Sequence, residues 1–277
     1  MIPKLKELNS DIQAQKRQKV IIKNKVAFLD KNISNVYAPL GVITILVVWQ
    51  IVSMSGLVNE FTLPSPSTIL LTAWELIKDG SLWTEISASL YRLGWGYFFG
   101  CIAGIAIGII LGFSKLSEKV GMPIVNTLYP IPKIAILPLI MLWLGIGEVS
   151  KITVIAIGVF FPVVYNTYTG VTQTQRLLIN VAVTFGASRM DLVKKVILPS
   201  SFPMMLSGMR IAAGTALLIL VSAEMVAAEH GIGAFILQNA DLLIISKVMV
   251  GVFILCILGL LFNQGLAWLE KKLIPWR

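Results

Sequence analysis

Of the ionisable residues that lie inside long apolar runs of this chain, two raise the first question about function. Lys133 lies among three prolines in LYPIPKIAILPLIMLWLGIG, and Glu224 lies in VSAEMVAAEHGIG. A charged side chain in apolar surroundings faces a solute pathway or pairs with other polar groups of the protein. Lys133 would therefore hold an anion or bind backbone carbonyls, and Glu224 would contact a solute or tie helices together.

Residues for covalent or metal chemistry are sparse. His230 is the one histidine and has no cysteine near it, and Cys101 and Cys256 each lie inside an apolar run, which argues against metal binding and disulfides. The loop pattern G-x-x-x-x-G-K-[ST], which binds nucleotide phosphates, does not occur. We therefore expect no catalytic residue, no metal site and no cofactor in this chain, so that any energy must come from a partner.

The composition is that of a membrane protein. Hydrophobic residues make up 56% of the 277 residues and charged residues 13%, against about 25% charged residues in soluble domains. Apolar windows of about 20 residues, enough to cross the hydrocarbon core as a helix, recur along the chain. We predict an all-α polytopic membrane protein whose six-helix domain covers residues 36–272, with spans at 36–56, 93–113, 122–146, 152–172, 204–228 and 248–269.

The charged residues predict the orientation of these spans. When loops are assigned alternately to two sides, most lysines and arginines fall with the tail 1–35, the loop 173–203 and the end 273–277. Basic loops stay in the cytoplasm, so both termini are expected there, and the net charge of +9 reflects this bias rather than nucleic-acid binding. The segment 57–91 then lies outside, where its apolar spacing predicts an amphipathic helix capped by Ser67.

The third span is interrupted by Pro130, Pro132 and Pro138. Prolines release backbone carbonyls, which are tolerated at membrane depth only where protein or a water-filled cavity supplies partners. This span is therefore the candidate for lining a pathway. The candidate path residues are Tyr129, Lys133, Met141, Trp143 and Glu224.

Glycine recurs at every fourth position of the second span. These overlapping G-x-x-x-G steps leave a groove that lets another helix approach closely. The partner is a helix of the same chain or a helix of another subunit. The predicted packing residues are Gly96, Gly100, Gly104, Gly108 and Gly112.

The segment NVAVTFGASRMDLVKKVILP, which runs from Asn180 to Pro199, is polar and basic between two apolar runs. Gly186 is a typical helix stop, and Ser188 with Asp191 forms the S-x-x-D pattern of a capping box. The sequence predicts a helix-turn-helix hairpin on the cytoplasmic side whose second helix ends at Pro199. Such a hairpin is suited to docking on a protein; a helix lying on the membrane surface is the alternative.

The hairpin resembles the cytoplasmic EAA loop of ABC importer permeases, with the pattern E-A-A-x-x-x-G and a later I-x-L-P. Asn180-Val181-Ala182 stands in place of E-A-A, Gly186 is the glycine, and Val196-Ile197-Leu198-Pro199 is the ending. Asn180 departs from the usual Glu. The segments LPSPSTI, YPIPKIAILPLIMLWLGIGE, ILPSSFPMMLSGMRIAAG and SAEMVAAEHGIG are similar to the nitrate, sulfonate, taurine and bicarbonate branch, so the resemblance covers almost the whole chain beyond the tail.

This resemblance implies the type I ABC importer permease fold in the bacterial inner membrane. It implies two permease copies, most simply a homodimer, two cytoplasmic ABC ATPase subunits that bind ATP and Mg, and an extracytoplasmic solute-binding protein. The hairpin would be the coupling helix that fits a cleft on the ATPase. The coupling residues would be Asn180, Ala182, Phe185, Gly186, Ala187, Ser188, Arg189, Asp191, Leu198 and Pro199.

The resemblance also implies a solute class. Small anions come first, an aliphatic sulfonate or taurine before nitrate or bicarbonate, and a neutral pyrimidine precursor of thiamine or a flavin is the alternative. A secondary transporter driven by an ion gradient is the alternative from another class. The sequence speaks against it, because we find no clear inverted repeat and only Glu224 is acidic at depth.

Overall fold

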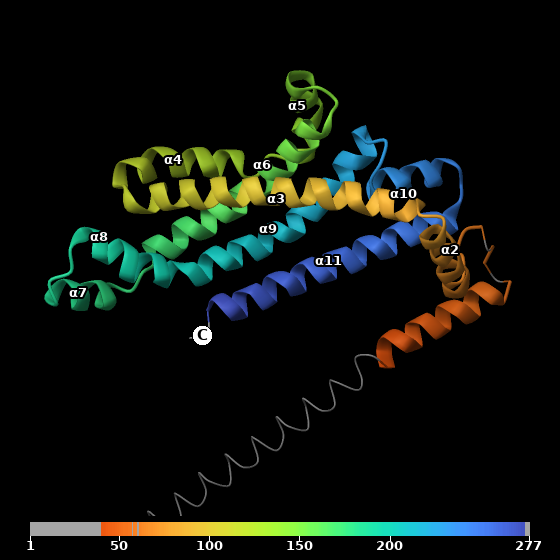
Figure 1. Ribbon diagram of the computed structural model, residues 1–277, viewed down its shortest axis with the longest axis horizontal. Coiled ribbons are helices and arrows are strands. Elements are labelled where there is room, and N and C mark those ends of the chain that lie inside the picture. The colour runs from red at the N-terminus through yellow and green to blue at the C-terminus, as the bar shows by residue number, and fades with distance from the viewer. Residues whose placement is uncertain (1–39, 57, 60, 275–277) are drawn as a thin grey trace, which may run out of the picture. The chain divides into compact units, whose positions relative to one another are not determined.

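The computed structural model describes residues 40–56, 58–59 and 61–274 (Figure 1). The predicted basic tail 1–35 and the chain from residue 275 onward lie outside the described residues. Within the described part every regular element is a helix, in agreement with the predicted all-α class. The chain forms two compact units, one ending at Thr68 and the other beginning at Ile69.

In the first unit, an apolar helix covers Leu40–Met54, inside the predicted span 36–56. Its described part is shorter than the roughly 20 residues needed to cross a membrane, so this span stays a prediction. The Ser53 hydroxyl donates to the carbonyl of Leu63 at 2.8 Å and anchors the following segment to the helix.

The start of helix α2 (Pro66–Lys78) corrects the predicted cap. The backbone N–H of Thr68 donates to the hydroxyl of Ser65 at 3.2 Å, so Ser65 caps the helix and Ser67 lies inside it. Pro66 occupies the first position of the helix, where a backbone N–H would have no acceptor within the helix. The N–H that proline lacks is therefore not needed there.

Four helices of the second unit are long and apolar enough to cross a membrane. They are α3 (Ser81–Phe113), α6 (Glu148–Thr172), the continuous helix Arg189–Ala227 and α11 (Ile245–Leu273). Three of them contain a predicted span, and Arg189–Ala227 covers all of the span 204–228 except its last residue. A bent pair of helices is either a broken span or a re-entrant loop: α4 (Lys115–Leu128) and the helical segment Lys133–Leu144 meet at an angle of 89°. That segment consists of the 3-10 turn η1 (Lys133–Ile136) and α5 (Leu137–Leu144), and its break lies at the prolines of the predicted third span.

Helix α3 starts earlier than the predicted span 93–113. It begins at Ser81, so the last part of the predicted outer segment 57–91 belongs to it. Glu85 and Arg92 lower the hydropathy of this stretch, yet both have partners and the helix continues through them. Its 33 residues give a length of about 50 Å, more than the ~30 Å hydrocarbon core.

The glycine stripe of α3 packs against α6 of the same chain. A methyl group at Gly100 would lie 2.6 Å from the carbonyl oxygen of Ala156 and from Cβ of Val159. The other four glycines meet α6 residues in the same way, and the α6 partners recur every four residues as the glycines do: Ile155, Val159, Val163, Thr167 and Val171. The two backbones therefore approach closely along the whole stripe, in an intramolecular contact.

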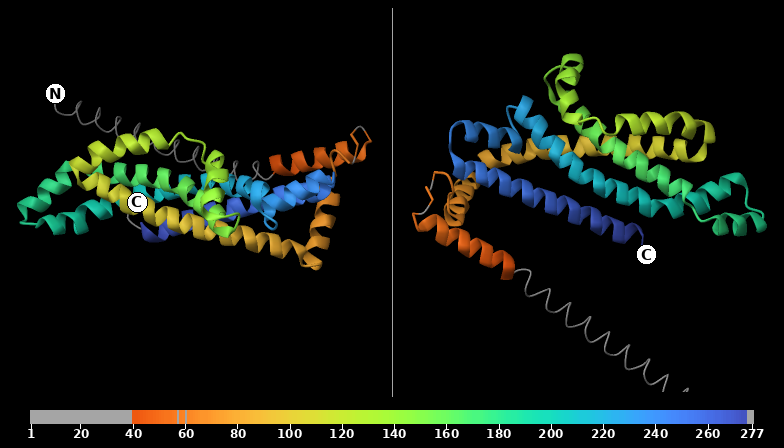
Figure 2. Two further views of the ribbon diagram at one scale, coloured as in Figure 1. Left: turned by 90° about the horizontal axis from the view of Figure 1, so that it is seen from above. Right: turned by 180° about the vertical axis from the view of Figure 1, so that it is seen from behind.

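Helix α6 also packs against α9 (Leu198–Ala227), and small residues again allow the approach. Ala212, Ala213 and Ala216 of α9 are buried in the core. Helix α10 (Ile232–Asp241) lies against α9 and α11. In Figures 1 and 2, α7 (Arg176–Thr184) and α8 (Arg189–Asp191) lie at one end of the second unit and α10 at the opposite end; we name these the hairpin end and the α10 end.

Candidate functional site

The first turn of the predicted hairpin is closed by backbone hydrogen bonds. Helix α7 ends at Thr184, and Gly186 has a φ of +78°, a left-handed conformation that favours glycine. The N–H of Gly186 donates to the carbonyl of Val183 at 2.9 Å, and that of Ala187 donates to Ala182 at 3.0 Å. This pair of bonds is the Schellman motif, which fixes the direction of the chain after α7.

The second arm begins with the predicted capping box. The hydroxyl of Ser188 accepts from the N–H of Asp191 at 3.2 Å, and the Asp191 carboxylate accepts from the N–H of Ser188 at 3.3 Å. Lys195 forms an ion pair with Asp191 at 2.7 Å, one turn further along. Both turns of the hairpin are thus held by local bonds.

The prediction that this arm ends at Pro199 is wrong. The π-helix η2 (Leu192–Ile197) follows α8 and continues directly into α9, so that Arg189–Ala227 is one helix of 39 residues. The N–H of Leu198 donates to the carbonyl of Val193, five residues back. In an α-helix the ring of Pro199 would clash with the carbonyl four residues earlier, and the wider π turn relieves this clash.

The hairpin presents apolar side chains outward. Phe185 is 86% exposed at the turn, and Leu177 and Met190 are exposed on either side of it. Asn180 and Arg189 are exposed, whereas Ala182, Ala187 and Leu198 are half-buried. A groove of about 390 Å³ lies between α7 and η2, lined by Leu178, Val181, Ala182, Lys195, Val196, Pro199 and Ser200. The turn, which local bonds hold in place, therefore carries an exposed aromatic tip.

Lys133 lies at the break between α4 and η1. Its ammonium donates to the carbonyls of Leu128 at 3.0 Å, Tyr129 at 2.6 Å and Ile131 at 2.7 Å, and it lies 4.5 Å from the ring centre of Phe161. An ammonium has three N–H donors, and here each has a backbone acceptor. Of the two interpretations of Lys133, the structure shows the pairing with backbone carbonyls.

The other candidate residues of the broken span lie on both sides of the break. Tyr129 is half-exposed at the end of α4. On α5, Met141 packs against the hydrophobic core, whereas Trp143 is 68% exposed. Leu142, beside Trp143, is also exposed, so α5 carries an apolar surface that the described residues leave uncovered.

Glu224 is fully buried in a cluster of charges at the α10 end. Its carboxylate accepts from the guanidinium of Arg92 at 2.8 Å, from the hydroxyl of Ser89 at 2.8 Å and from the N–H of Gly233 at 2.9 Å. Arg92 donates two further bonds to the carboxylate of Glu148, at 2.6 and 2.8 Å. The cluster therefore joins α3, α6, α9 and the start of α10, which is the pairing interpretation of Glu224.

The partners of Glu224 in this cluster were not predicted from the sequence. Arg92 is 3% exposed and Lys151 is 4% exposed, and Lys151 donates to Glu148 at 3.1 Å. Intramembrane charges pair with one another. The sequence did contain a signal for these contacts. Two basic and two acidic residues in or beside three predicted spans all fall near the same edge of the membrane: Arg92, Lys151, Glu148 and Glu224.

The comparisons with known proteins point to one family of membrane transport proteins. Residues 104–275 match the family described as "Binding-protein-dependent transport system inner membrane component". A permease protein of Bacillus subtilis named for aliphatic sulfonate transport, SsuC, is 38% identical over 84% of each chain. The taurine transport system permease protein TauC of Escherichia coli is 34% identical over 84% of this chain and 86% of that protein. The nitrate import permease protein NrtB of Synechocystis is 33% identical over 88% and 93%.

Solved structures show the same fold at lower identity. A chain of the MetNI methionine ABC transporter, in an inward-facing conformation, aligns with a TM-score of 0.59 at 22% identity and covers 69% of this chain and 95% of that one. A chain of an amino acid ABC transporter aligns with a TM-score of 0.56 at 16% identity and covers 72% and 97%.

Proposed function

Because this chain belongs to the family of binding-protein-dependent transport inner membrane components, we propose that it is the permease subunit of an ATP-driven importer. In this proposal the chain crosses the membrane six times with both termini in the cytoplasm. Two partner ATPase subunits bind ATP and Mg, a second copy of the chain completes the path, and a binding protein delivers the solute from outside.

The observation that carries the proposal is the exposed tip of the hairpin. Phe185 exposes 86% of its surface on a turn fixed by the Schellman motif and the capping box. Covering this apolar side chain with a partner protein would remove its surface from water, which is favourable. The next helix runs without interruption from Arg189 to Ala227, so a displacement of the tip would pass into the membrane domain.

The broken span supports the role of the second copy. Helix α5 turns away from α4 by 89°, and Leu142 and Trp143 expose 79% and 68% of their surface. A symmetric dimer buries the same patch of both copies, so this surface is a natural contact beside the path. Tyr129 and Lys133 at the break would then lie next to the solute.

For the solute we propose a small anion, with an aliphatic sulfonate or taurine ahead of nitrate and bicarbonate. The relatives named for sulfonate, taurine and nitrate transport support this choice. A neutral pyrimidine precursor of thiamine or a flavin is the second candidate class. Lys133 brings a positive charge to the path in either case, although its three donors bind backbone carbonyls.

The test is reconstitution of the tagged permease with its co-purified ATPase and binding protein. We expect ATP-dependent uptake of one labelled solute, and we expect Phe185→Asp to abolish co-purification of the ATPase. The matched control is Trp268→Asp, because Trp268 is also an exposed aromatic residue but belongs to α11, which is not part of the hairpin. Uptake driven by an ion gradient without ATP, or unchanged ATPase binding in the Phe185 variant, would contradict the proposal.

A further inference from the structure

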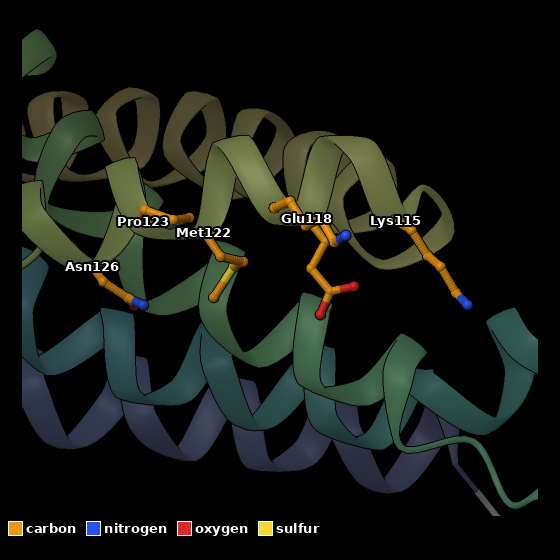
Figure 3. A pocket seen from close by; sticks show the side chains of 6 residues that line it. Lys115, Glu118, Met122, Pro123 and Asn126 are labelled. Carbon is orange, nitrogen blue, oxygen red and sulfur yellow. The ribbon is translucent and has the colours of Figure 1, made fainter.

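One face of α4 forms an open groove of about 390 Å³ near the hairpin end, lined by charged, polar and apolar side chains. Its lining residues follow helical spacing, so they share one side of the helix (Figure 3): Lys115, Glu118, Lys119, Met122, Pro123 and Asn126. Figure 3 shows Lys115 and Asn126 at the two ends of this face, with Glu118 and Met122 between them. Met122 is buried and forms an apolar floor.

The two lysines of the groove are exposed, and its acid is tied back into the protein. Glu118 is the only acidic residue among the lining residues. The hydroxyl of Tyr168, on α6, donates to the Glu118 carboxylate at 2.6 Å. The carboxylate is thus directed onto α6, while Lys115 and Lys119 keep their ammonium groups at the exposed surface of α4.

Helix α4 itself runs from the hairpin end toward the break in the third span. Helix α4 ends at Leu128, and the ammonium of Lys133 lies on the carbonyls at that end. Lys115, Lys119 and Asn126 therefore follow one another along α4 from the hairpin end toward the break, where the three donors of Lys133 are already bound. Because Tyr168 binds the Glu118 carboxylate, the two lysine ammonium groups are the exposed charges of the groove, and clustered basic side chains concentrate anions.

We propose that this groove binds a small oxyanion, a sulfonate or an inorganic anion, in the half of the path nearer the ATPase. Tyr168 is its specificity-determining residue. Without the tyrosine hydroxyl, the Glu118 carboxylate turns to Lys115, three residues earlier on the helix, and neutralises that charge. This inference rests on the proposed function, and it selects the anion over the neutral pyrimidine or flavin.

A set of variants tests the proposal in the reconstituted complex, with ATP-driven uptake of labelled ethanesulfonate as the readout. We expect the double variant Lys115→Gln, Lys119→Gln to lower the initial rate of uptake at low salt by about fivefold or more. Added salt should reduce the difference in rate between the variant and the wild type, because it screens the lysine charges. Tyr168→Phe lowers uptake in the same direction. Adding Glu118→Gln to Tyr168→Phe restores it, which a merely structural role of Tyr168 does not explain.

The control removes two positive charges elsewhere. Lys271→Gln with Lys272→Gln, in the last turn of α11, leaves the groove intact and should leave uptake unchanged. ATP hydrolysis by the complex should stay within about twofold in all variants, since none lies in the coupling hairpin. Equal loss in the α11 variant, or no rescue by Glu118→Gln, overturns the proposal.

Two further outcomes distinguish a solute groove from a lipid site and from a path for a neutral solute. An anionic lipid headgroup has the same chemistry as the solute, so uptake is compared in vesicles of phosphatidylcholine alone and in vesicles with phosphatidylglycerol. An effect of the lysines that needs phosphatidylglycerol assigns the groove to lipid and overturns the proposal. If the complex takes up a labelled neutral pyrimidine in an ATP-dependent way but takes up neither ethanesulfonate nor nitrate, the oxyanion groove is refuted. The importer function is then still supported. No ATP-driven uptake of any solute refutes the proposed function itself.

Discussion

Replacing Arg92 by methionine, which has a similar length, should destabilise the protein more than any other loss of a single ion pair. Arg92 is 3% exposed and binds Glu224, Glu148 and the carbonyl of His230. Its removal leaves the fully buried carboxylate of Glu224 with only the Ser89 hydroxyl and the Gly233 N–H. Breaking one side of a buried pair costs about 3–5 kcal/mol.

Chemical unfolding in mixed micelles, followed by tryptophan fluorescence, measures this loss of stability. Glu224→Gln added to Arg92→Met should recover most of the loss, because the stranded charge is gone. The control is Lys195→Met, which breaks an exposed pair with Asp191 and should change stability little. The stabilising role of Arg92 is refuted if Arg92→Met loses no more stability than the control, or if adding Glu224→Gln recovers none of the loss.

Three other predictions follow from single positions. Gly100→Val should lower the free energy of unfolding by about 1–3 kcal/mol in the same micelle assay, because the new side chain meets the α6 backbone. The control Gly94→Val should be tolerated, since nothing lies within 4 Å of a Cβ at that position. Equal effects of the two substitutions would contradict the close contact between α3 and α6. Gly186→Ala should strain the left-handed turn by roughly 1–2 kcal/mol and reduce uptake while ATP hydrolysis continues, and normal uptake would refute the coupling role of the turn. Lys133→Met should reduce uptake of anionic and neutral solutes alike, since it removes the partner of three carbonyls; a loss confined to anions would return Lys133 to anion binding.

The local features of the hairpin could be predicted from the sequence because short-range bonds determine them. Gly186 stops α7 and Ser188 caps the next helix within a few residues of chain. The continuation through Pro199 could not be predicted, because it depends on a π turn that no periodicity signals. The same division applies to the glycines of α3, whose spacing predicted tight packing but not that α6 is the partner.

The charge cluster escaped prediction for a different reason. Arg92 and Glu224 are separated by more than a hundred residues, and their contact depends on how α3 and α9 lie beside α6. A hydropathy scale assigns each charged residue an unfavourable value regardless of its neighbours. In the structure these charged residues form ion pairs, which reduces the cost of burying them. The early start of α3 was missed for this reason too, since Arg92 and Glu85 look like loop residues until their partners are known.

The proposed importer needs one rigid part that transmits movement and one surface that opens. The contacts within the second unit indicate which helices form each part. The helix Arg189–Ala227 is 39 residues, or about 58 Å, long and joins the hairpin to the Glu224 cluster. At the α10 end that cluster ties it to α3 and α6, and along their length the glycine stripe holds α3 against α6. A tilt imposed on the hairpin would therefore reach the α10 end as movement of one body. The path must then open at surfaces that this body presents to the second copy, and α5, with its exposed Leu142 and Trp143 beyond an 89° break, is the surface best suited to that role.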